Sequence, residues 1–257
     1  MTLRLVLRIA LLCASGLAAD RLTAQAPEPN QPQGGTPPQR TETLHYSVDW
    51  HFVRAGQVVV KNTGIRRTQM NLSSTGLVSR MFRVEDEYAV TRDARGCSET
   101  LSMKVQEGRR LRDVHATFDT ADRKATFVER DLVRNSIVSQ KQSDIPGCVY
   151  DLLGGLDVFR NSHPKPGQSW NVLISDGKKT ANVHVVAEDK EIVKTPLGQF
   201  QSTRYEAFVF GGVLYGRNGR LFAWITDDDA RLPIQFRIQL PFYVGTVTLQ
   251  LEKVERP

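Results

Sequence analysis

Apolar and polar residues alternate along most of the chain from Thr41 onward, which is the pattern of half-buried β-strands. The clearest case is the segment 232–240. One face of a strand there would carry Leu232, Ile234, Phe236, Ile238 and Leu240, and the other face would carry Gln235, Arg237 and Gln239. The alternation predicts that the first set is buried and that the second set faces water.

Turn-forming pairs separate the alternating runs at short intervals, as at Ala55-Gly56, Glu107-Gly108 and Asn218-Gly219. Short connections between neighbouring strands indicate hairpins, so the sheet is expected to be antiparallel. About a dozen strands are too many for a flat open sheet, which curls or closes. The sequence therefore predicts a mainly β fold, with a strongly curved antiparallel sheet or barrel and one short covering helix.

One segment departs from the strand pattern. Between Cys148 and Arg160 the apolar residues Val149, Leu152, Leu153, Leu156 and Phe159 recur at helical spacing. Gly154-Gly155 in its middle weakens the helical propensity, but proline and glycine bound the segment on both sides. It is predicted to be the longest helix, and a second helical turn is expected at Leu77 to Phe82.

The N-terminus has the order of a secretory signal peptide, with Arg4 and Arg8 before an apolar run and small residues. Ala24-Gln25-Ala26 predicts cleavage after Ala26, so residues 1–26 are expected to be removed, and a cut after Ala19 is the alternative. Residues 27–40 hold five prolines and two glycines and no aliphatic residue, which is typical of a disordered tether. Residues 41–257 are expected to form a single β-rich domain.

Export to the periplasm or cell envelope follows from this leader. A lipoprotein anchor at Cys13 is not favoured, because Leu12 precedes the cysteine where a small residue is needed. No later stretch approaches the roughly 20 apolar residues of a membrane-spanning helix, so none is expected in the mature chain. Without the leader the formal charge falls from +6 to about +4, and basic clusters lack interleaved aromatics, so no nucleic-acid partner is predicted.

Removal of the leader leaves two cysteines, Cys97 and Cys148. Two cysteines in an oxidising compartment are most simply interpreted as one disulfide. A metal pair or a reactive thiol would be the alternatives, but neither cysteine has a CxxC spacing or a histidine beside it. The predicted bridge would close a loop of 148 − 97 = 51 residues.

Several segments together resemble a known family. They are LHYSVDWHFVRAGQVVV from Leu44, the TPLG-x-F turn from Thr195 to Phe200, and the W-x-T-D-x-x-x-R-x-P block from Trp224 to Pro233. In order and character the chain is similar, from about Leu44 to Glu252, to the bacterial domain-of-unknown-function 3108 family. The resemblance implies an exported, mainly β protein without an established activity, and it transfers no catalytic residues.

The face His45, Ser47, Asp49 and His51 of the first strand contains the residue types of a catalytic triad or a metal site. Side chains two apart on a strand point the same way about 7 Å apart, so a water-facing strand explains them better. The run from Asp227 to Asp229 is interpreted as a turn rather than a calcium site, since no EF-hand spacing follows. The remaining histidines, His115, His163 and His184, stand alone.

No catalytic residue, metal ligand or cofactor is therefore predicted. A remaining alternative is a hydrolase of an envelope polymer that uses a carboxylate pair not recognisable from the sequence. The favoured hypothesis is a non-enzymatic envelope protein that binds a hydrophobic or lipid-like ligand in its curved sheet. Six aromatic residues could line such a cavity: Trp50, Phe52, Trp224, Phe236, Phe242 and Tyr243. The alternative is a structural or assembly factor that binds another envelope protein or the cell wall.

Overall fold

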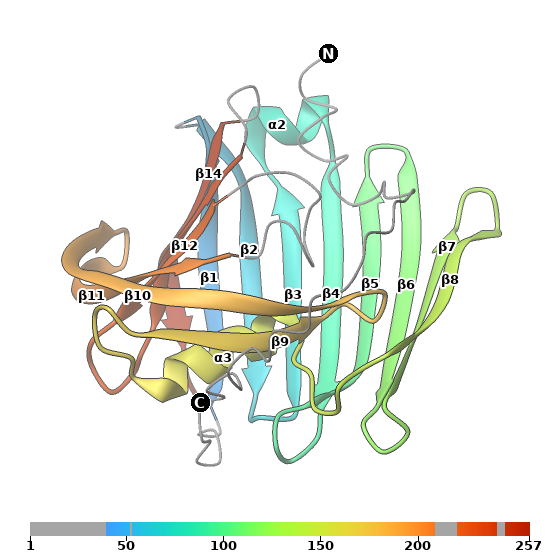
Figure 1. Ribbon diagram of the computed structural model, residues 1–257. Coiled ribbons are helices and arrows are strands. Elements are labelled where there is room, and N and C mark those ends of the chain that lie inside the picture. The colour runs from blue at the N-terminus through green and yellow to red at the C-terminus, as the bar shows by residue number, and fades with distance from the viewer. Residues whose placement is uncertain (1–39, 52, 209–219, 241–244) are drawn as a thin grey trace, which may run out of the picture.

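The computed structural model describes residues 40–51, 53–208, 220–240 and 245–257. Within these ranges fourteen strands form one antiparallel sheet (Figure 1). The predicted leader and almost all of the predicted tether lie outside the described residues, as do Phe52, Phe242, Tyr243 and the Asn218-Gly219 turn.

The first eight strands form a meander that ends in an outer strand. They are β1 (Thr41–Trp50), β2 (Val53–Thr63), β3 (Arg67–Ser74), β4 (Val84–Arg92), β5 (Ser98–Glu107), β6 (Arg110–Asp119), β7 (Lys124–Asp131) and β8 (Ser136–Asp144). The last six strands continue from the other side of β1: β9 (Ser169–Ser175), β10 (Thr180–Thr195), β11 (Gly198–Ala207), β12 (Arg220–Thr226), β13 (Pro233–Gln239) and β14 (Thr246–Glu255). Pairing of β1 with β14 joins the two halves, so the strand order runs from β8 through β1 and β14 to β9.

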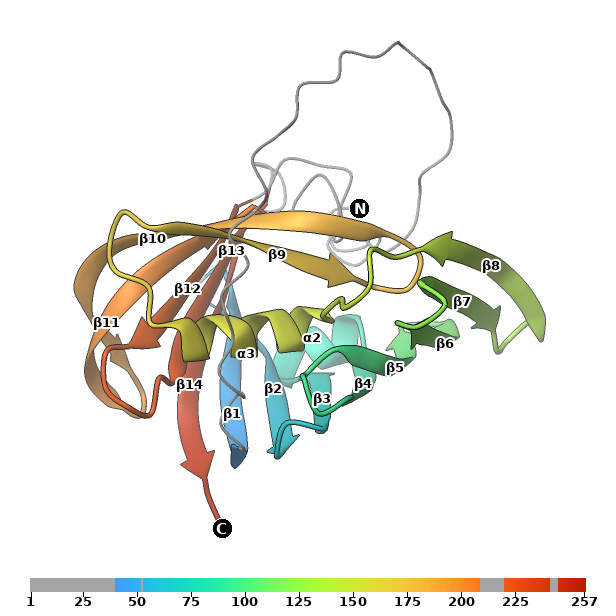
Figure 2. The same cartoon turned by 60° about the horizontal axis from the view of Figure 1, so that its bottom comes forward.

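The sheet is strongly curled but not closed, which confirms the predicted fold class (Figure 2). Its two outer strands, β8 and β9, are not paired with each other. The β9–β10 turn nevertheless approaches β8, because Ser143 Oγ donates to the carbonyl of Gly177 at 3.2 Å and Lys141 Nζ to that of Lys178 at 3.0 Å. Side-chain contacts thus hold the curl where no backbone ladder closes it.

Two helices lie among the described residues. The six-residue α2 (Gly76–Met81) connects β3 to β4 and matches the expected helical turn, and α3 (Leu152–Ser162) is the longer one, as predicted. The expected start of α3 at Cys148 is wrong. Asp151 caps the helix by accepting from the backbone N–H groups of Leu153 and Gly154. Before it the chain is extended, with Tyr150 forming a parallel bridge to Ile174.

The inner face of the sheet is the face that contacts α3, and it carries the core. Leu44, Val90, Leu101, Ile234 and Leu251 are at most 4% exposed there. Phe159 of α3 packs in a cluster with side chains of β9, β10 and β11. Figures 1 and 2 show that α3 crosses the strands near the ends where β1 begins and β14 finishes. We call this end of the curled sheet the closed end and the opposite end the open end.

The predicted sorting of residues 232–240 is only partly correct. Leu232 and Ile234 are buried, but Phe236 is only half-buried and Gln235 is 5% exposed instead of facing water. Gln235 lies opposite Trp224 and accepts a hydrogen bond from Gln250 Nε2 at 3.3 Å. The outer face of the sheet is therefore covered by neighbouring side chains at Gln235. For this reason the residues of this strand do not simply alternate between buried and exposed.

The predicted disulfide is confirmed: Cys97 and Cys148 are bonded, with Cα atoms 5.2 Å apart. Cys97 directly precedes β5, and Cys148 lies in the extended segment before α3. The bond therefore ties the sheet to the chain that delivers α3 to its inner face.

Replacing both cysteines by serine should lower the free energy of unfolding by about 4 kcal/mol, because the bond constrains a long loop in the unfolded chain. Denaturant unfolding with and without reductant measures this difference. The wild type should lose stability in reductant while the Cys97→Ser/Cys148→Ser variant does not respond. An equal response of both proteins would contradict the role assigned to the bond.

Candidate binding site inside the curled sheet

Asp151 is the centre of the polar network that closes one end of the sheet. It is fully buried, and its carboxylate forms a bidentate pair with Arg92 of β4, at 2.7 Å to Nε and 3.0 Å to Nη2. Tyr88 donates its hydroxyl to the same carboxylate at 3.0 Å and Ser98 at 3.3 Å. The carboxylate thus joins β4, β5 and the N-terminus of α3, and its charge suits the positive end of the helix dipole.

The pKa values of the groups around Asp151 reflect this burial. Burial acts to lower the pKa of Arg92, but the carboxylate of Asp151 more than reverses the effect and leaves it raised. Burial, reinforced by Asp151, raises the pKa of the Tyr88 hydroxyl well above its usual value. Both groups therefore keep their protons across the physiological range, and the network is held as an ion pair with a neutral phenol.

A second buried pair fixes the other end of α3. Arg160 is 1% exposed and donates from Nη1 to Glu42 of β1 at 2.7 Å and from Nε to the carbonyl of Arg231 at 2.8 Å. Arg231 is itself buried and donates to the hydroxyl of Tyr205 at 3.0 Å. The helix is thus anchored at both ends by guanidinium groups in which every nitrogen atom donates a hydrogen bond.

The glycine pair that weakened the helix prediction has a packing role. A Cβ atom on Gly154 would lie 2.7 Å from Asp151 Oδ2 and 2.9 Å from Arg92 Nε. A Cβ atom on Gly155 would lie 2.3 Å from Cδ1 of Ile174 on β9. The two glycines therefore let the helix approach the ion pair on one side and β9 on the other.

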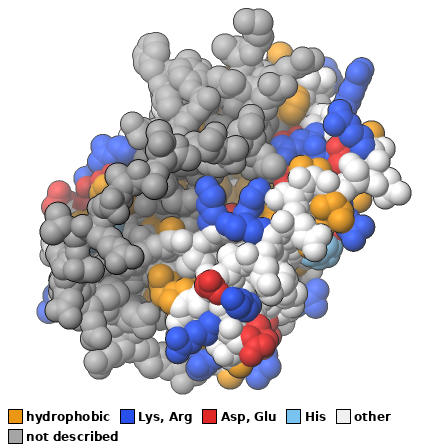
Figure 3. Space-filling model, turned by 45° about the vertical axis from the view of Figure 1, so that its right-hand side comes forward, with side chains coloured by type: hydrophobic (Ala, Val, Ile, Leu, Met, Phe, Trp, Pro, Cys, Tyr) orange, Lys and Arg blue, Asp and Glu red, His pale blue; other side chains and the backbone are white. Residues whose placement is uncertain are grey.

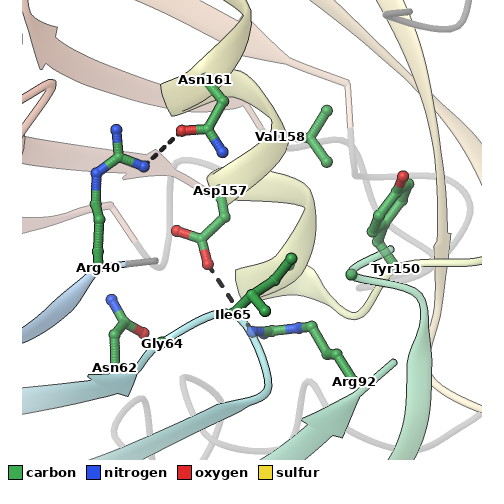
Figure 4. A pocket seen from close by; sticks show the side chains of 11 residues that line it. Arg40, Asn62, Gly64, Ile65, Arg92, Tyr150, Asp157, Val158 and Asn161 are labelled. Carbon is green, nitrogen blue, oxygen red and sulfur yellow. Dashed lines mark hydrogen bonds and ion pairs between the residues drawn. The ribbon is translucent and has the colours of Figure 1, made fainter. Parts of the chain in front are cut away.

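A small pocket remains between α3 and the strand ends (Figure 4). Arg40, Asn62, Arg92, Asp157 and Asn161 supply its polar lining. Its cavity volume of about 30 Å³ has room for roughly two water molecules. Burial raises the pKa of Asp157, against the lowering effect of Arg160 and Arg92. The pocket is too small for an organic ligand, so we interpret it as part of the network that holds α3.

The open end of the inner face is different, because its apolar side chains are not covered by α3. Half-buried positions on the inner face of β3, β5, β13 and β14 are Met70, Leu72, Met103, Val105, Phe236, Ile238, Val247 and Leu249. These side chains form an apolar strip on the concave side of the sheet. Because they are only half-buried, the strip can accept a further apolar surface.

On the same inner face, charged side chains lie next to the strip on strands β4 to β7. The row, which we call the charged row, consists of Asp86, Glu107, Arg110, Arg112, Glu129 and Asp131. Arg110 contacts Glu107 and Glu129, each at 3.4 Å, and Arg112 pairs with Glu129 and Asp131. Glu129 is 1% exposed, and its Oε2 atom has no hydrogen-bond partner among the described residues. Four carboxyl groups thus share two guanidinium groups.

Two carboxyl groups of the charged row have raised pKa values. Burial raises the pKa of Glu107 to about 7, with a further rise from the nearby Asp86 and an opposing effect of Arg110. Burial raises the pKa of Asp86 to about 6, while the backbone N–H of Gln106 and the charge of Arg110 act in the opposite direction. Both groups therefore change charge between pH 5 and pH 8.

The residues that were singled out from the sequence on the first strand have separate local contacts. His45 lies 3.5 Å from Glu255, and Ser47 is buried, donating to the carbonyl of Gln250 at 3.3 Å. The expectation that this whole face is exposed to water is thus wrong at Ser47, because this small side chain lies between the longer side chains of Gln57 on β2 and Gln250 on β14. Within the described ranges no three His, Cys, Asp or Glu side chains gather in a metal-binding arrangement.

The aspartates 227–229 lie between β12 and β13, as expected of a turn. Thr226 Oγ1 bonds Asp228, whose carboxylate also accepts from the backbone N–H of Arg231. His115 Nε2 lies 3.0 Å from the carboxylate of Asp113, and His184 Nδ1 lies 3.0 Å from Oδ1 of Asn171. His163 donates from Nδ1 to the backbone carbonyl of Asn161 at 3.0 Å. On the side of the molecule turned forward in Figure 3, the described basic and acidic side chains are interspersed rather than gathered in one patch.

The aromatic residues expected to line a cavity do so only in part. Phe236 lies on the inner face, where its ring is 5.8 Å from that of Tyr46. Trp224 points to the opposite face and is 3% exposed. The guanidinium of Arg237 covers it, with its Cζ atom 5.1 Å from the centre of the indole ring. Sequence reasoning did not identify Arg92, Asp151 or Arg160. The only signal was the position of Asp151 just before an apolar helical segment, which is typical of an N-cap.

Fold and site together define a half-barrel protein: a curled antiparallel sheet with one end filled by a helix and the other lined by a partly uncovered apolar strip. Residues 45–252 match the model of a protein family of unknown function, DUF3108. The chain therefore belongs to the DUF3108 family, which confirms the resemblance seen in the sequence.

Among solved structures the chain is similar to a β-barrel-like protein of domain of unknown function DUF1849 from Brucella abortus. The TM-score is 0.56 at 10% identity, over 84% of this chain and 97% of that one. A protein described as exported, with a YmcC-like fold, from Bacteroides fragilis aligns over 86% of this chain and 98% of its own at 11% identity, with a TM-score of 0.32. The first likeness supports the fold alone. No curated protein matches the sequence.

Replacing Asp151 by asparagine should lower the free energy of unfolding by about 3–5 kcal/mol, because Arg92 would be left buried without its counter-charge. Asp157→Asn is the matched control on the same helix: its side chain is only half-buried and its carboxylate lies 3.7–3.8 Å from the two arginines, beyond hydrogen-bond distance, so its loss should cost less than about 1 kcal/mol. Denaturant unfolding compares the two. Equal losses would contradict the central role of Asp151.

The raised pKa of Glu107 predicts a pH dependence of stability. Because the folded chain binds this proton more tightly than the unfolded chain, the stabilisation is complete below about pH 4.5, the usual value, and is lost as the pH rises through about 7. Glu107→Gln should therefore be more stable than the wild type at pH 8, by about 1–2 kcal/mol, and should gain little at pH 4. Chemical unfolding at both pH values measures the difference, and an equal effect at the two values would refute the assignment.

Proposed function

We propose that this protein is an exported, non-enzymatic component of the cell envelope that binds a lipid-like ligand on the inner face of its curled sheet. The observation that carries the proposal is the apolar strip at the open end. At the closed end the equivalent inner face is almost fully buried under α3. The strip therefore offers a concave apolar surface for the kind of contact that removes a hydrocarbon chain from water.

The neighbourhood of the strip also favours an amphiphilic ligand. Leu72 lies opposite Asp86 on the adjacent strand, and Asp86 lies opposite Val105 on the next one. The charged row thus begins within the strip at Asp86 and continues past Val105 at Arg112, so a polar head group beside the strip would meet carboxyl and guanidinium groups. A hydrocarbon chain along the strip with its polar end at the charged row uses both surfaces.

Location in the envelope rests on the N-terminal sequence, whose charged, apolar and small residues are those of a secretory leader. Among the described residues no helix is long and apolar enough to cross a membrane. The confirmed disulfide agrees with an oxidising compartment, since such bonds are rare in the cytosol.

The test is binding of cis-parinaric acid, a fluorescent fatty acid, to the chain purified after export from a bacterial host. We expect saturable binding that Leu72→Gln weakens about fivefold, because a polar amide replaces part of the apolar strip. Val59→Gln is the control, since Val59 lies on the opposite face of β2 and is half-buried as well.

Absence of saturable binding by the wild type would refute the proposal. Equal weakening by Leu72→Gln and Val59→Gln would also contradict it, because the effect would then not come from the inner face. Circular dichroism of each variant at the assay temperature verifies that it is folded.

A further inference from the structure

The connections at the two ends of the first eight strands differ in their exposed apolar residues. Because β1 to β8 form an antiparallel meander, their connections alternate between the open and closed ends. At the open end lie the β1–β2 turn, the segment 75–83 with α2, the β5–β6 turn 108–109 and the β7–β8 turn 132–135. At the closed end lie the connections 64–66, 93–97 and 120–123. Figure 1 shows α2 and the neighbouring open-end connections along the upper edge of the sheet.

Large apolar side chains project from the open-end connections. Leu77 and Met81 of α2 are 70% and 74% exposed, and Leu132 and Val133 of the β7–β8 turn are 51% and 63% exposed. Val53, the first residue of β2, is 53% exposed. The three closed-end connections carry none of the large exposed apolar residues found in the described chain. Projecting apolar side chains on several separate turns are typical of a surface that meets another apolar phase or partner.

The charge of these connections is one-sided. The segments 75–83, 108–109 and 132–135 contain Arg80, Arg83, Arg109 and Arg134 and no aspartate or glutamate. Arg83 pairs with Glu85 at 2.7 Å. Arg80, Arg109 and Arg134 form no ion pair with any described residue, so their charges remain available.

The closed-end connections, by contrast, mix both signs. Asp93 and Arg95 neutralise each other through a contact of 2.9 Å, and Asp122 stands next to Arg123. Only Arg66 is without a neighbouring carboxylate in its connection. The excess of positive charge is therefore a property of the open end.

We propose that the open-end connections dock on an anionic lipid surface. Leu77, Met81, Leu132 and Val133 enter the head-group region, and the arginines lie against the lipid phosphates. Apolar insertion combined with basic residues is the combination that binds proteins to the interface of a bilayer. Exposed apolar tips at separate turns along one edge suit a broad flat surface, whereas a protein partner would be expected to bury one continuous patch.

This inference does not depend on the proposed ligand, because it rests on the connections and not on the inner face. If both hold, the apolar strip lies at the end of the sheet next to the membrane from which a lipid-like ligand would be taken or to which it would be delivered. The two proposals can also fail separately, since fatty-acid binding and vesicle binding are measured on different variants.

Flotation with vesicles tests the docking, using the chain purified after export so that any leader has been removed. One set of vesicles contains phosphatidylglycerol and phosphatidylcholine, and the other contains phosphatidylcholine alone. We expect the wild type to float with the anionic vesicles only. Arg80→Glu/Arg134→Glu should weaken this binding about thirtyfold or more, because each basic residue near an anionic surface contributes on the order of a fivefold gain in affinity.

The matched control for charge is Arg66→Glu/Arg123→Glu, which changes the net charge equally at the closed end. A second pair of variants tests the apolar contact: Leu77→Ser/Leu132→Ser at the open end, and Ile192→Ser/Leu197→Ser as the control. Ile192 and Leu197 belong to the β10–β11 hairpin, whose turn lies at the closed end, and are 59% and 37% exposed. Only the two open-end variants should lose vesicle binding.

Failure of the wild type to float with anionic vesicles would overturn the inference. Equal binding to neutral vesicles, or equal losses in the open-end and closed-end variants, would overturn it as well. All substituted side chains are exposed, so unfolding should not intervene, and unchanged melting temperatures verify this for each variant.

Discussion

The buried pair between Arg92 and Asp151 is the interaction on which the rest of the structure depends. A guanidinium group inside a sheet needs a counter-charge and partners for its N–H groups, and here the carboxylate and the hydroxyl of Thr68 supply them. The same carboxylate caps α3, so charge compensation and helix initiation occur at one residue. The disulfide at Cys148, three residues earlier, limits where this residue can lie.

The position of α3 divides the sheet into two unlike ends. A helix with its side chains is about 10 Å wide, whereas a strand of ten residues is about 33 Å long. One helix that crosses the strands therefore covers only part of the inner face. The part that it covers is closely packed, and the other part keeps the apolar strip and the charged row. This asymmetry has a geometric origin and does not require a special composition at either end.

The open end combines three features that are separate in the sequence: an apolar strip, a row of charged groups of which two have raised pKa values, and connections with exposed apolar residues and arginines that form no ion pair within the described ranges. The meander brings the connections together because every second turn returns to the same edge. Curling brings the strip and the charged row to one concave side. A lipid-like ligand and an anionic membrane both match this arrangement. The ligand would contact the strip and the charged row, whereas the membrane would contact the open-end connections.

Much of this architecture could be predicted from local pattern. Alternation and short turns determined an antiparallel β protein, because side-chain direction in a strand has a period of two and short connections reverse the chain. Two cysteines left after the leader determined a disulfide. The helical spacing after Cys148 determined a helix, although its first residue depended on the cap formed by Asp151.

Tertiary structure alone decided which faces are covered. Gln235 and Ser47 are buried because neighbouring strands and side chains cover the second face of the sheet, and nothing in their own segments records those neighbours. The partners of Arg92 and Arg160 come from positions 59 and 118 residues away, so their burial could not be foreseen from spacing. The candidate site has the same origin. The apolar strip, the charged row and the open-end connections come together only when strands that are distant in the sequence pair. Such pairing depends on the whole chain, whereas local sequence carries information only about its own segment.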